Sequence, residues 1–555
     1  MKPIKTRIEN YLVLTLVSTT LIITPNVGFD SFNVPKLLIL VIGSITTFTL
    51  IISARLLLKE YLFQPYSIIF LVFLFCLTSV LIFSGAPLLN QIFGTFGRSS
   101  GYLAYLMLIL LVFVIVVLWS EKFEVKFIYG LLTAGTVNLI YAIFQSFRLD
   151  LFKWGNVASP IFGTFGNANF LSAFLGITSI VALALLLDSK SKNHLLSFFL
   201  VCKIILSQSV ILLSTSNQGI LIFLISSAVI IYYRYIRVLP KVLFRIIFIG
   251  IFSLGFLIGL MGILNFGPLA SLLFQQSTQL RGDYWRAGWR MGLDNPFFGV
   301  GLDNYGSWWL KYRDQAAILR APDVTSNAAH NVFIDMLANG GIPLFLIHII
   351  LFMLITKYAI ANVRATSHYQ ALNIATFAAW LAFGIQSIVS IFQLGLTSWG
   401  WAFMGLIIGR YLKMKNITKA ESNVGKNSQS PNKRNKSEDN YVFVGIPAIA
   451  FAIAISIWPI RQDFLFKSAI QSNQIMSINK SIYTFPRNDF YAVVVAETYL
   501  NSKLYDESLK ATKLALNSNP NNYLALELLV KNPISTITSI EVSKSKMRLL
   551  NPYKS

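Results

Sequence analysis

The sequence predicts an all-α, polytopic membrane protein with about 12–13 spans. Only 12% of the 555 residues are charged and 55% are hydrophobic, whereas a soluble domain carries roughly 25% charged residues. Apolar runs of about 20 residues recur along the chain, and this is the length at which a helix crosses a hydrocarbon core of roughly 30 Å. Because no water reaches the backbone there, each run must bond its own N–H and C=O groups as a helix.

The expected spans follow one another from the N-terminus and are joined mostly by short connectors. They are 8–24, 35–54, 66–84, 100–119, 126–147, 168–187, 194–214, 219–233, 241–262, 332–356, 371–392, 395–412 and 441–458. The first run follows three basic residues and resembles a signal peptide, but it lacks a small-residue cleavage site. We therefore expect it to be retained as the first span.

The distribution of Lys and Arg predicts the orientation of the spans. The net charge is +23, and most of the excess lies in short connectors such as 55–59 and 234–241 and in the segment 410–440. If the N-terminus is cytoplasmic, every inner connector is basic, as the positive-inside rule requires. The charge therefore indicates topology, and we expect a multi-pass plasma-membrane protein without a nucleic-acid partner. The loop 263–331 and the region 459–555 then lie outside the cytoplasm.

Composition divides the chain into four parts. They are a membrane domain, 1–415, which includes the large extracytoplasmic loop 263–331; a polar cytoplasmic linker, 416–440; a last span, 441–458; and a helical region, 459–555. In the last part, five residues fit the spacing of one tetratricopeptide repeat that begins near Asp489, namely Ala496, Tyr499, Tyr505, Ala515 and Pro520. The alternative is an ordinary helical hairpin. We expect removal of 461–555 to spare the basic reaction.

His330 stands where the polar loop 263–331 meets the next apolar run. An imidazole titrates near neutral pH, so at the edge of a membrane, beside an arginine-rich loop, it suits proton transfer next to an anionic lipid headgroup. If His330 is a base, activity should fall as the pH drops through the ordinary titration range of imidazole. The alternative is a histidine that caps a helix or anchors it at the interface.

The six-residue sequence Ile-Phe-Gly-Thr-Phe-Gly occurs twice, at 92–97 and at 161–166. Each copy precedes a span, and glycines let the backbone approach a ligand closely. Free N–H groups at helix N-termini favour anions, and Asn167 and Asn169 are suitable as caps or ligands. Arg98 adds a fixed positive charge. The two turns are therefore candidates to hold a diphosphate; the alternative is a structural turn with Arg98 as an interfacial anchor.

Several motifs together resemble the superfamily of O-antigen ligases, O-antigen polymerases and O-oligosaccharyltransferases. The outer loop of that family has an entry arginine before a Trp, matched by Arg281 and Trp285, and then a Pro-x-x-Gly-x-Gly turn, matched by 296–301. The loop ends at a His with a Gly about ten residues further on, matched by His330 and Gly340. The combination is specific, although each motif alone is weak.

The resemblance, which covers about 90–410, implies a glycosyltransferase of cell-surface polysaccharide assembly. Its donor is a glycan on a polyprenyl (undecaprenyl) diphosphate carrier, and the glycan passes to an acceptor hydroxyl on the extracytoplasmic face. The diphosphate is already a leaving group, so we expect no cofactor and no metal. The implied roles are His330 and Arg281 as catalytic residues, Arg98, Arg286 and Gln218 as diphosphate-binding residues, and Asn331, Gly340, Asn167 and Asn169 as supporting residues.

One residue departs from the family pattern. Gln218 stands where family members often have an arginine that is thought to hold phosphate, and an amide donates hydrogen bonds but brings no charge. Arg98 or Arg286 would have to supply the missing charge, or the diphosphate is held less tightly.

Other functions remain open at this point. A multi-span transporter or a flippase of lipid-linked glycan is the alternative class, and a scaffold that recruits a protein partner through the C-terminal repeats is a third. The spans contain few charged residues, and this argues against transport, because transport routes are usually marked by ionisable groups inside the membrane. Within the enzyme class, the acceptor is a lipid core, a second lipid-linked glycan chain or a protein hydroxyl.

Overall fold

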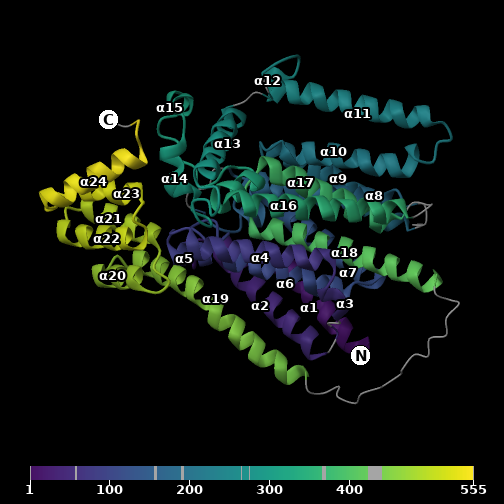
Figure 1. The fold of residues 1–555 in the computed structure, drawn as a ribbon, viewed down its shortest axis with the longest axis horizontal. Helices are drawn as coiled ribbons and strands as arrows, with labels where there is room; N and C mark the ends of the chain where they lie inside the picture. Colours follow the sequence, from purple (N-terminus) through teal and green to yellow (C-terminus); the bar gives the residue numbers. More distant parts are fainter. Residues whose placement is uncertain are drawn as a thin grey trace.

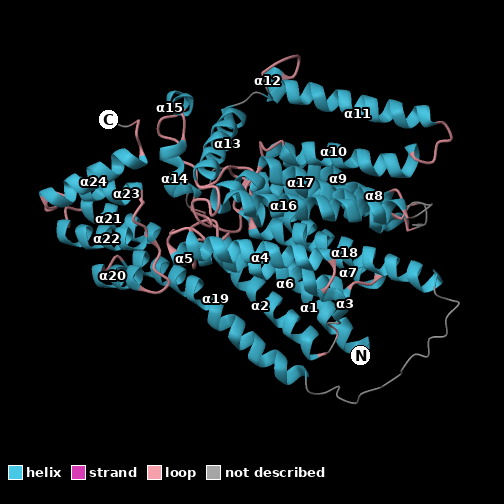
Figure 2. Ribbon diagram, in the orientation of Figure 1, coloured by secondary structure: helices cyan, strands magenta, loops and turns pink. Residues whose placement is uncertain are grey.

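The chain is a bundle of helices with a smaller group of helices at one end (Figure 1). The computed structural model describes residues 2–54, 56, 59–154, 159–188, 193–263, 265–273, 276–365, 370–422 and 441–553. Within these residues the chain forms helices and connecting loops without a β-strand (Figure 2). Ten of the described helices are long and apolar enough to cross a membrane. The prediction of an all-α, multi-pass membrane protein is confirmed.

Thirteen of the described helices coincide with the thirteen expected spans. They are α1 Lys2–Leu21, α2 Asn33–Ser53, α4 Pro65–Phe83, α6 Tyr102–Leu118, α7 Glu121–Ser146, α8 Ala168–Leu186, α9 His194–Leu213, α10 Gln218–Ile231, α11 Val242–Ile263, α16 Val332–Arg364, α17 Ala371–Val389, α18 Leu394–Ser422 and α19 Tyr441–Ser472. Of these, α6 is apolar but shorter than a usual span, and α1 and α18 are not among the ten. The short helices α3 Lys59–Leu62 and α5 Leu88–Phe93 and the π-helical turn Tyr232–Ile236 lie between them.

The membrane helices share one apolar core. α1 packs against α2, α7 and α18, α8 packs against α9, α10 and α17, and α16 packs against α4, α17 and α18. Small residues let some of these backbones approach closely: a Cβ on Gly219 of α10 would lie 2.1 Å from the carbonyl O of Ser172 on α8. α11 runs along the edge of the bundle (Figure 1), and most of its described side chains are exposed.

Some membrane helices bury charged side chains, which corrects the expectation that they are almost free of them. Glu124 of α7 is fully buried and pairs with Arg410 of α18. The ammonium of Lys36 donates to two backbone carbonyls of the α1 end, at 2.9 and 2.8 Å. Lys203 of α9 is 2% exposed and donates to the Thr178 hydroxyl at 3.2 Å. Apart from Lys203, these groups are satisfied by a carboxylate or by carbonyls, as buried charges within a packed protein must be.

The loop 263–331 folds into a small domain with its own core. Its helices are α12 Ala270–Leu273, α13 Gln276–Asp294, α14 Tyr305–Tyr312 and α15 Gln315–Arg320. Aromatic side chains such as Tyr284, Tyr305 and Trp309 form this core together with Ala329, which comes just before α16. α13 packs along α16, so the loop is fixed to one membrane helix.

The C-terminal region packs at the same end of the bundle as the loop domain (Figure 1). Its helices are α20 Ile475–Tyr483, α21 Asp489–Asn501, α22 Tyr505–Ser518, α23 Tyr523–Lys531 and α24 Ile537–Leu550. α19 runs unbroken from Tyr441 to Ser472, so the last span, expected to end at 458, continues into this region as one helix. Residues 416–422 of the expected linker belong to α18, and 423–440 lie outside the described residues.

Aromatic rings and carboxylates attach the C-terminal region to the bundle. Phe490 of α21 stacks on Phe96 with ring centroids 4.0 Å apart. Asp463 of α19 accepts hydrogen bonds from the backbone N–H groups of Phe29 and Asp30, both at 2.8 Å. These contacts join the loop between α1 and α2 and the first hexapeptide copy to the last hundred residues. The membrane bundle and the C-terminal region therefore form one continuous surface.

Candidate active site

A break in α16 fastens the loop 263–331 to the membrane helices. This loop is called the outer loop below, after the side of the membrane on which it is expected. Gly341 interrupts the helix with a φ of +73°, a conformation that favours glycine. The interruption frees the carbonyl of Ala338 to accept from the N–H of Val300 at 2.8 Å. A Cβ on Gly299 would lie 2.4 Å from the Gly340 nitrogen, so the two backbones touch. The Pro-x-x-Gly-x-Gly turn and the glycine pair after His330 therefore form one contact.

His330 lies immediately before α16, and its backbone is held in the left-handed region with a φ of +54°. Asn331 caps the helix, because its Oδ1 accepts from the N–H groups of Phe333 and Ile334 at 3.0 and 3.2 Å. Asn331, expected as a supporting residue, thus fixes the start of the helix that follows His330. A non-glycine residue with a positive φ is uncommon and is maintained only where its surroundings enforce it.

The imidazole of His330 stacks on the ring of Tyr284 from α13, with centroids 5.1 Å apart. Tyr284 is fixed in turn by the hydroxyl of Tyr305, which donates to its carbonyl at 2.8 Å. Burial, helped by the positive charges of Arg98 and Arg281, lowers the pKa of His330 to about 3. His330 is therefore uncharged and able to accept a proton throughout the neutral range. This lowered pKa predicts no titration of His330 in the ordinary imidazole range, in contrast to the expectation from the sequence.

Arg281 lies one helical turn before Tyr284 on α13. Its side chain is half-buried, and burial lowers the pKa of its guanidinium. Arg281 makes no hydrogen bond or ion pair within the described residues. A partly desolvated cation without a counter-ion is unfavourable, and an anionic ligand would remove that cost. Arg281 is therefore the strongest candidate in the site for contact with a phosphate.

Arg98 is 5% exposed and lies next to two buried carboxylates. Its Nη1 makes long hydrogen bonds to Asn327, at 3.3 and 3.5 Å, and its Nε has no partner within the described residues. Together with Asp303 and Asp335 it lines a cavity of ≈ 20 Å³. Burial raises the pKa of Asp303, and the charge of Arg98 opposes that rise. The two carboxylates therefore neutralise part of the positive charge of Arg98, which was expected to bind diphosphate.

Two acidic side chains, Asp303 and Asp335, line the same cavity. Within the described residues, no group of three or more His, Cys, Asp or Glu side chains lies together.

Several N–H groups of the two hexapeptide copies, where a diphosphate cradle was expected, are bonded inside the protein. In the first copy the N–H of Thr95 donates to Asp303 at 2.8 Å. In the second, the N–H groups of Phe162 and Gly163 donate to the side-chain oxygen of Gln145 at 3.0 and 2.9 Å. Carbonyl and carboxylate oxygens accept from these N–H groups, so the N–H groups are not free to bind an anion.

Gln218, Asn167 and Asn169 form a separate polar group at the starts of α8 and α10. Asn167 caps α8 by accepting from the Asn169 N–H at 2.8 Å, and the Asn169 side chain accepts from the Ser216 hydroxyl at 2.7 Å. Gln218 is 9% exposed, and its amide has no partner within the described residues. No hydrogen bond among the described residues joins this group to His330.

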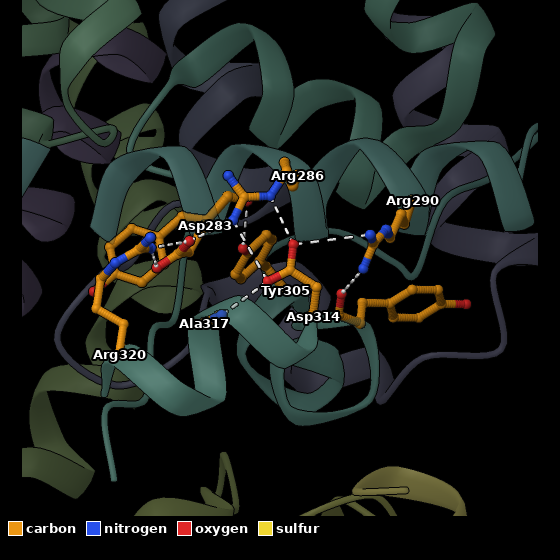
Figure 3. Close-up of polar contacts among 9 residues, drawn as sticks. Asp283, Arg286, Arg290, Tyr305, Asp314, Ala317 and Arg320 are labelled. Carbon is orange, nitrogen blue, oxygen red and sulfur yellow. Dashed lines mark hydrogen bonds and ion pairs between the residues drawn. The ribbon is translucent and has the colours of Figure 1, made fainter. Parts of the chain in front are cut away.

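Arg286 belongs to an ion-pair network that ties α13 to α15 (Figure 3). Its guanidinium donates to Asp314 at 2.7 Å and also pairs with Asp283, which is 1% exposed at its side chain. Arg320 pairs with Asp283, and Arg290 lies 3.8 Å from Asp314. The hydrogen bond from Arg286, helped by the charge of Arg290, lowers the pKa of Asp314. The structure therefore places Arg286 with carboxylates, and not beside the His330 ring.

Tyr284, Asp303 and Asp335 are site residues that the sequence analysis did not select. Asp335 carries a signal in the sequence, since it is an acidic residue in the first turn of an otherwise apolar run, five residues after His330. Its carboxylate accepts from the backbone N–H of Ala329 at 2.7 Å and so fixes the approach to His330. Tyr284 and Asp303 carry no signal that separates them from the other polar residues of the loop.

Residues 202–349 match the family model described as O-antigen ligase. The matched segment runs from α9 into α16 and covers less than a third of the chain. It contains Gln218, Arg281, Arg286 and His330, and it leaves out Arg98 and both asparagines of α8. A comparison with curated proteins found no match. The match supports the resemblance read from the outer loop. The tetratricopeptide assignment lies outside it and stays a prediction, although α21 and α22 do pack as a helical pair.

Proposed function

We propose that this protein is a membrane glycosyltransferase. It transfers a glycan from a polyprenyl diphosphate carrier, such as undecaprenyl diphosphate, to an acceptor hydroxyl at the outer face of the membrane. The observation that carries the proposal is the stacking of His330 on Tyr284, close enough to Arg98 and Arg281 for their charges to lower its pKa, together with the lack of a carboxylate partner for Arg281 within the described residues. A proton acceptor beside a free guanidinium fork suits a reaction in which a hydroxyl is deprotonated while a diphosphate leaves.

The reaction needs one proton transfer and one displacement. The acceptor oxygen attacks the anomeric carbon of the donor sugar while His330 takes its proton. The bond from that carbon to the diphosphate oxygen breaks, and the diphosphate leaves with the electron pair. Arg281 can bind two of its oxygens at once, since a guanidinium matches phosphate geometry. Arg98 adds positive charge from deeper in the protein.

The low pKa of His330 gives the donor a second role. In the free protein, burial and the two arginines both disfavour the imidazolium. A bound diphosphate brings negative charge next to the same arginines and reverses part of that effect. His330 therefore becomes a stronger base when the donor is bound.

Transport remains the second candidate function, and Lys203 is the observation that favours it. This buried lysine has one hydroxyl contact and no carboxylate partner within the described residues. A single such group does not mark a route across the membrane, whereas His330, Tyr284 and Arg281 converge at one place. We therefore rank transfer above transport.

The test is transfer by the purified full chain in detergent, without ATP and without an ion gradient. The donor is a polyprenyl-diphosphate-linked glycan, and the acceptors are a lipid core, a second lipid-linked glycan and a serine-containing peptide. We expect a glycosylated acceptor and free carrier diphosphate, with one acceptor strongly preferred.

The variants in this assay are His330→Asn and His330→Ala. Asn tolerates a positive φ, so His330→Asn removes the base with little backbone cost. We expect transfer by the His330 variants to fall at least about 100-fold, because a general base is lost. The control His194→Ala, at an exposed helix start away from the loop, should keep the original rate. A well-folded His330→Asn protein that transfers normally would remove the base role. Absence of transfer, with movement of the lipid-linked glycan across vesicles, would favour transport.

A further inference from the structure

A second cavity, of ≈ 380 Å³, lies between the outer loop and the last helix, α24. It is much larger than the cavity beside Arg98 and falls within the range of about 300–1,000 Å³ that ligand sites usually have. Its charged lining consists of four cations, Arg290, Lys311, Arg313 and Arg548, and one carboxylate, Asp294. The lining therefore has a strong positive excess and is assembled from parts of the chain more than 200 residues apart.

The cations of this cavity are only partly neutralised by the protein. Arg313 is 5% exposed; its Nη1 donates to the carbonyl of Pro322 at 2.7 Å, and its Nε is buried without a partner within the described residues. Arg548 on α24 is exposed and makes no hydrogen bond or ion pair within those residues. The nearest carboxylate to Arg290 is Asp314, at 3.8 Å. The unpaired guanidinium of Arg548, together with cations that are only partly neutralised around the same cavity, suits an anionic ligand.

Two tyrosines, Tyr312 and Tyr553, line the same cavity. Tyrosine offers an apolar face and a polar hydroxyl, and this combination suits a sugar ring, which has both apolar C–H faces and hydroxyl groups. The cavity also lies on the helix that carries Arg281. Arg281 and Arg290 are nine residues apart on α13, which corresponds to about 14 Å along the helix axis. Nine residues are about two and a half turns, so the two side chains leave opposite sides of α13. A glycan whose reacting end lies at Arg281 must therefore pass around this helix to place a sugar further along the chain in the cavity.

We infer that the cavity between α13, α14 and α24 binds an acidic sugar of the glycan, one that carries a carboxylate or a phosphate. The inference rests on the proposed function, since it takes the ligand to be part of the transferred or the accepting chain. It gives the C-terminal region a specific part in selecting that chain, because Arg548 and Tyr553 come from it. Neutral glycans of the same length should bind more weakly, because they leave the positive excess unpaired.

The test is binding to the purified full chain, measured by calorimetry, and it does not depend on transfer. Tetragalacturonate is the acidic probe, maltotetraose the neutral one, and tetraglutamate carries four side-chain carboxylates without sugar rings. Glucose 6-phosphate tests phosphate in place of carboxylate. The variant is Arg548→Glu, and the control is Lys544→Glu, which makes the same charge change at an exposed position of α24 that does not line the cavity.

We expect tetragalacturonate to bind at least tenfold more tightly than maltotetraose, and about tenfold corresponds to 1.4 kcal/mol. Arg548→Glu should weaken the binding of tetragalacturonate at least tenfold. Lys544→Glu should change it less than twofold. If glucose 6-phosphate alone shows this dependence on Arg548, the anionic group is a phosphate and the inference stands. Tetraglutamate binding as tightly as tetragalacturonate would overturn it in favour of an acidic peptide. Equal effects of both variants, or no binding of either acidic sugar, would also overturn it.

The outcome is separable from that of the proposed function. If binding behaves as expected but the protein transfers no glycan, the acidic-sugar site stands and the transferase proposal falls. If the protein transfers glycan and Arg548→Glu changes neither binding nor the preference for acidic chains, the transferase proposal stands and this inference falls.

Discussion

Arg281 and Arg286 lie on the same helix, five residues apart, and their surroundings differ. Arg286 contacts two carboxylates, Asp283 and Asp314, whereas Arg281 contacts none within the described residues. The same residue type therefore has two roles in one helix. A paired arginine ties α13 to α15, and an unpaired one remains available to an anion.

This contrast predicts opposite effects of two identical substitutions. Arg281→Lys should lower kcat/KM for the lipid donor at least about tenfold, because lysine keeps the charge but loses the planar fork, and a charge-assisted hydrogen bond is worth about 1.5–3 kcal/mol. It should leave thermal stability nearly unchanged. Arg286→Lys should lower the unfolding temperature and affect kcat/KM less. Steady-state kinetics and thermal unfolding in detergent measure both; the reverse pattern would assign the phosphate contact to Arg286.

The pH profile is a second prediction at this scale. Burial and the neighbouring arginines lower the pKa of His330 to about 3 in the free protein, so its proton-accepting form persists as the pH falls from 8 to about 5. The value of kcat/KM, which reports on free enzyme, should show no His330 titration across that range. A fall in kcat/KM with a midpoint near the ordinary imidazole value of about 6.5 would contradict the buried environment, provided that the fall disappears when another base replaces His330.

At the scale of elements, the junction between the outer loop and α16 depends on backbone contacts. The N–H of Ile342 donates to the carbonyl of Pro296 at 2.7 Å, just after the break at Gly341. The break lets the turn 296–301 lie against the helix where an unbroken helix would present no free carbonyl. This junction also places His330, because His330 directly precedes the Asn331 cap of the same helix.

Two glycines with similar φ angles provide a test of that junction. Gly341 and Gly97 have φ values of +73° and +76°. A Cβ at Gly341 would lie 2.5 Å from the carbonyl of Pro296, whereas a Cβ at Gly97 would have nothing within 4 Å. Gly97→Ala should therefore cost about 1–3 kcal/mol of backbone strain, and Gly341→Ala should cost more and also reduce transfer. Thermal unfolding and activity measure this; equal losses in the two variants would mean that the junction does not hold the site.

At the scale of the whole molecule, the C-terminal region and the outer loop form one surface. The side chain of Asn519 donates to the Ser307 hydroxyl of α14 at 3.1 Å and to Asp489 at 2.8 Å. Asp489 also accepts from Asn90 at 3.1 Å. Parts of one folded protein in such contact must lie on the same side of the membrane.

Cysteine labelling tests this arrangement in cells. In a chain with Cys76 and Cys202 replaced by alanine, Ser502→Cys and Gln315→Cys each introduce one exposed thiol, in the C-terminal region and in the outer loop. We expect an impermeant maleimide added from outside to label both. Labelling of Gln315→Cys alone would place the C-terminal region on the cytoplasmic side and would contradict the thirteen-span topology.

Removal of 461–555 should have a larger effect than the sequence analysis expected. It deletes Asp463, which bonds two N–H groups of the first loop, and the aromatic partner of Phe96. Leaving those groups unpaired is costly, so we expect a truncated protein that aggregates or unfolds at lower temperature, as size-exclusion chromatography and thermal unfolding would show. A monodisperse truncation with the original transfer rate would restore the view that the region is dispensable.

The sequence by itself determined the order of the membrane helices, because an apolar run of about 20 residues has one way to satisfy its backbone in a bilayer. It also identified His330, Arg281 and the glycine motifs of the outer loop. It could not show that Asp303 accepts a hydrogen bond from the Thr95 N–H, or that Asp283 and Asp314 form ion pairs with Arg286. Those pairings join residues from different helices and loops. Only the tertiary structure decided which charges are neutralised, since desolvation and the distance between opposite charges depend on packing rather than on order in the chain.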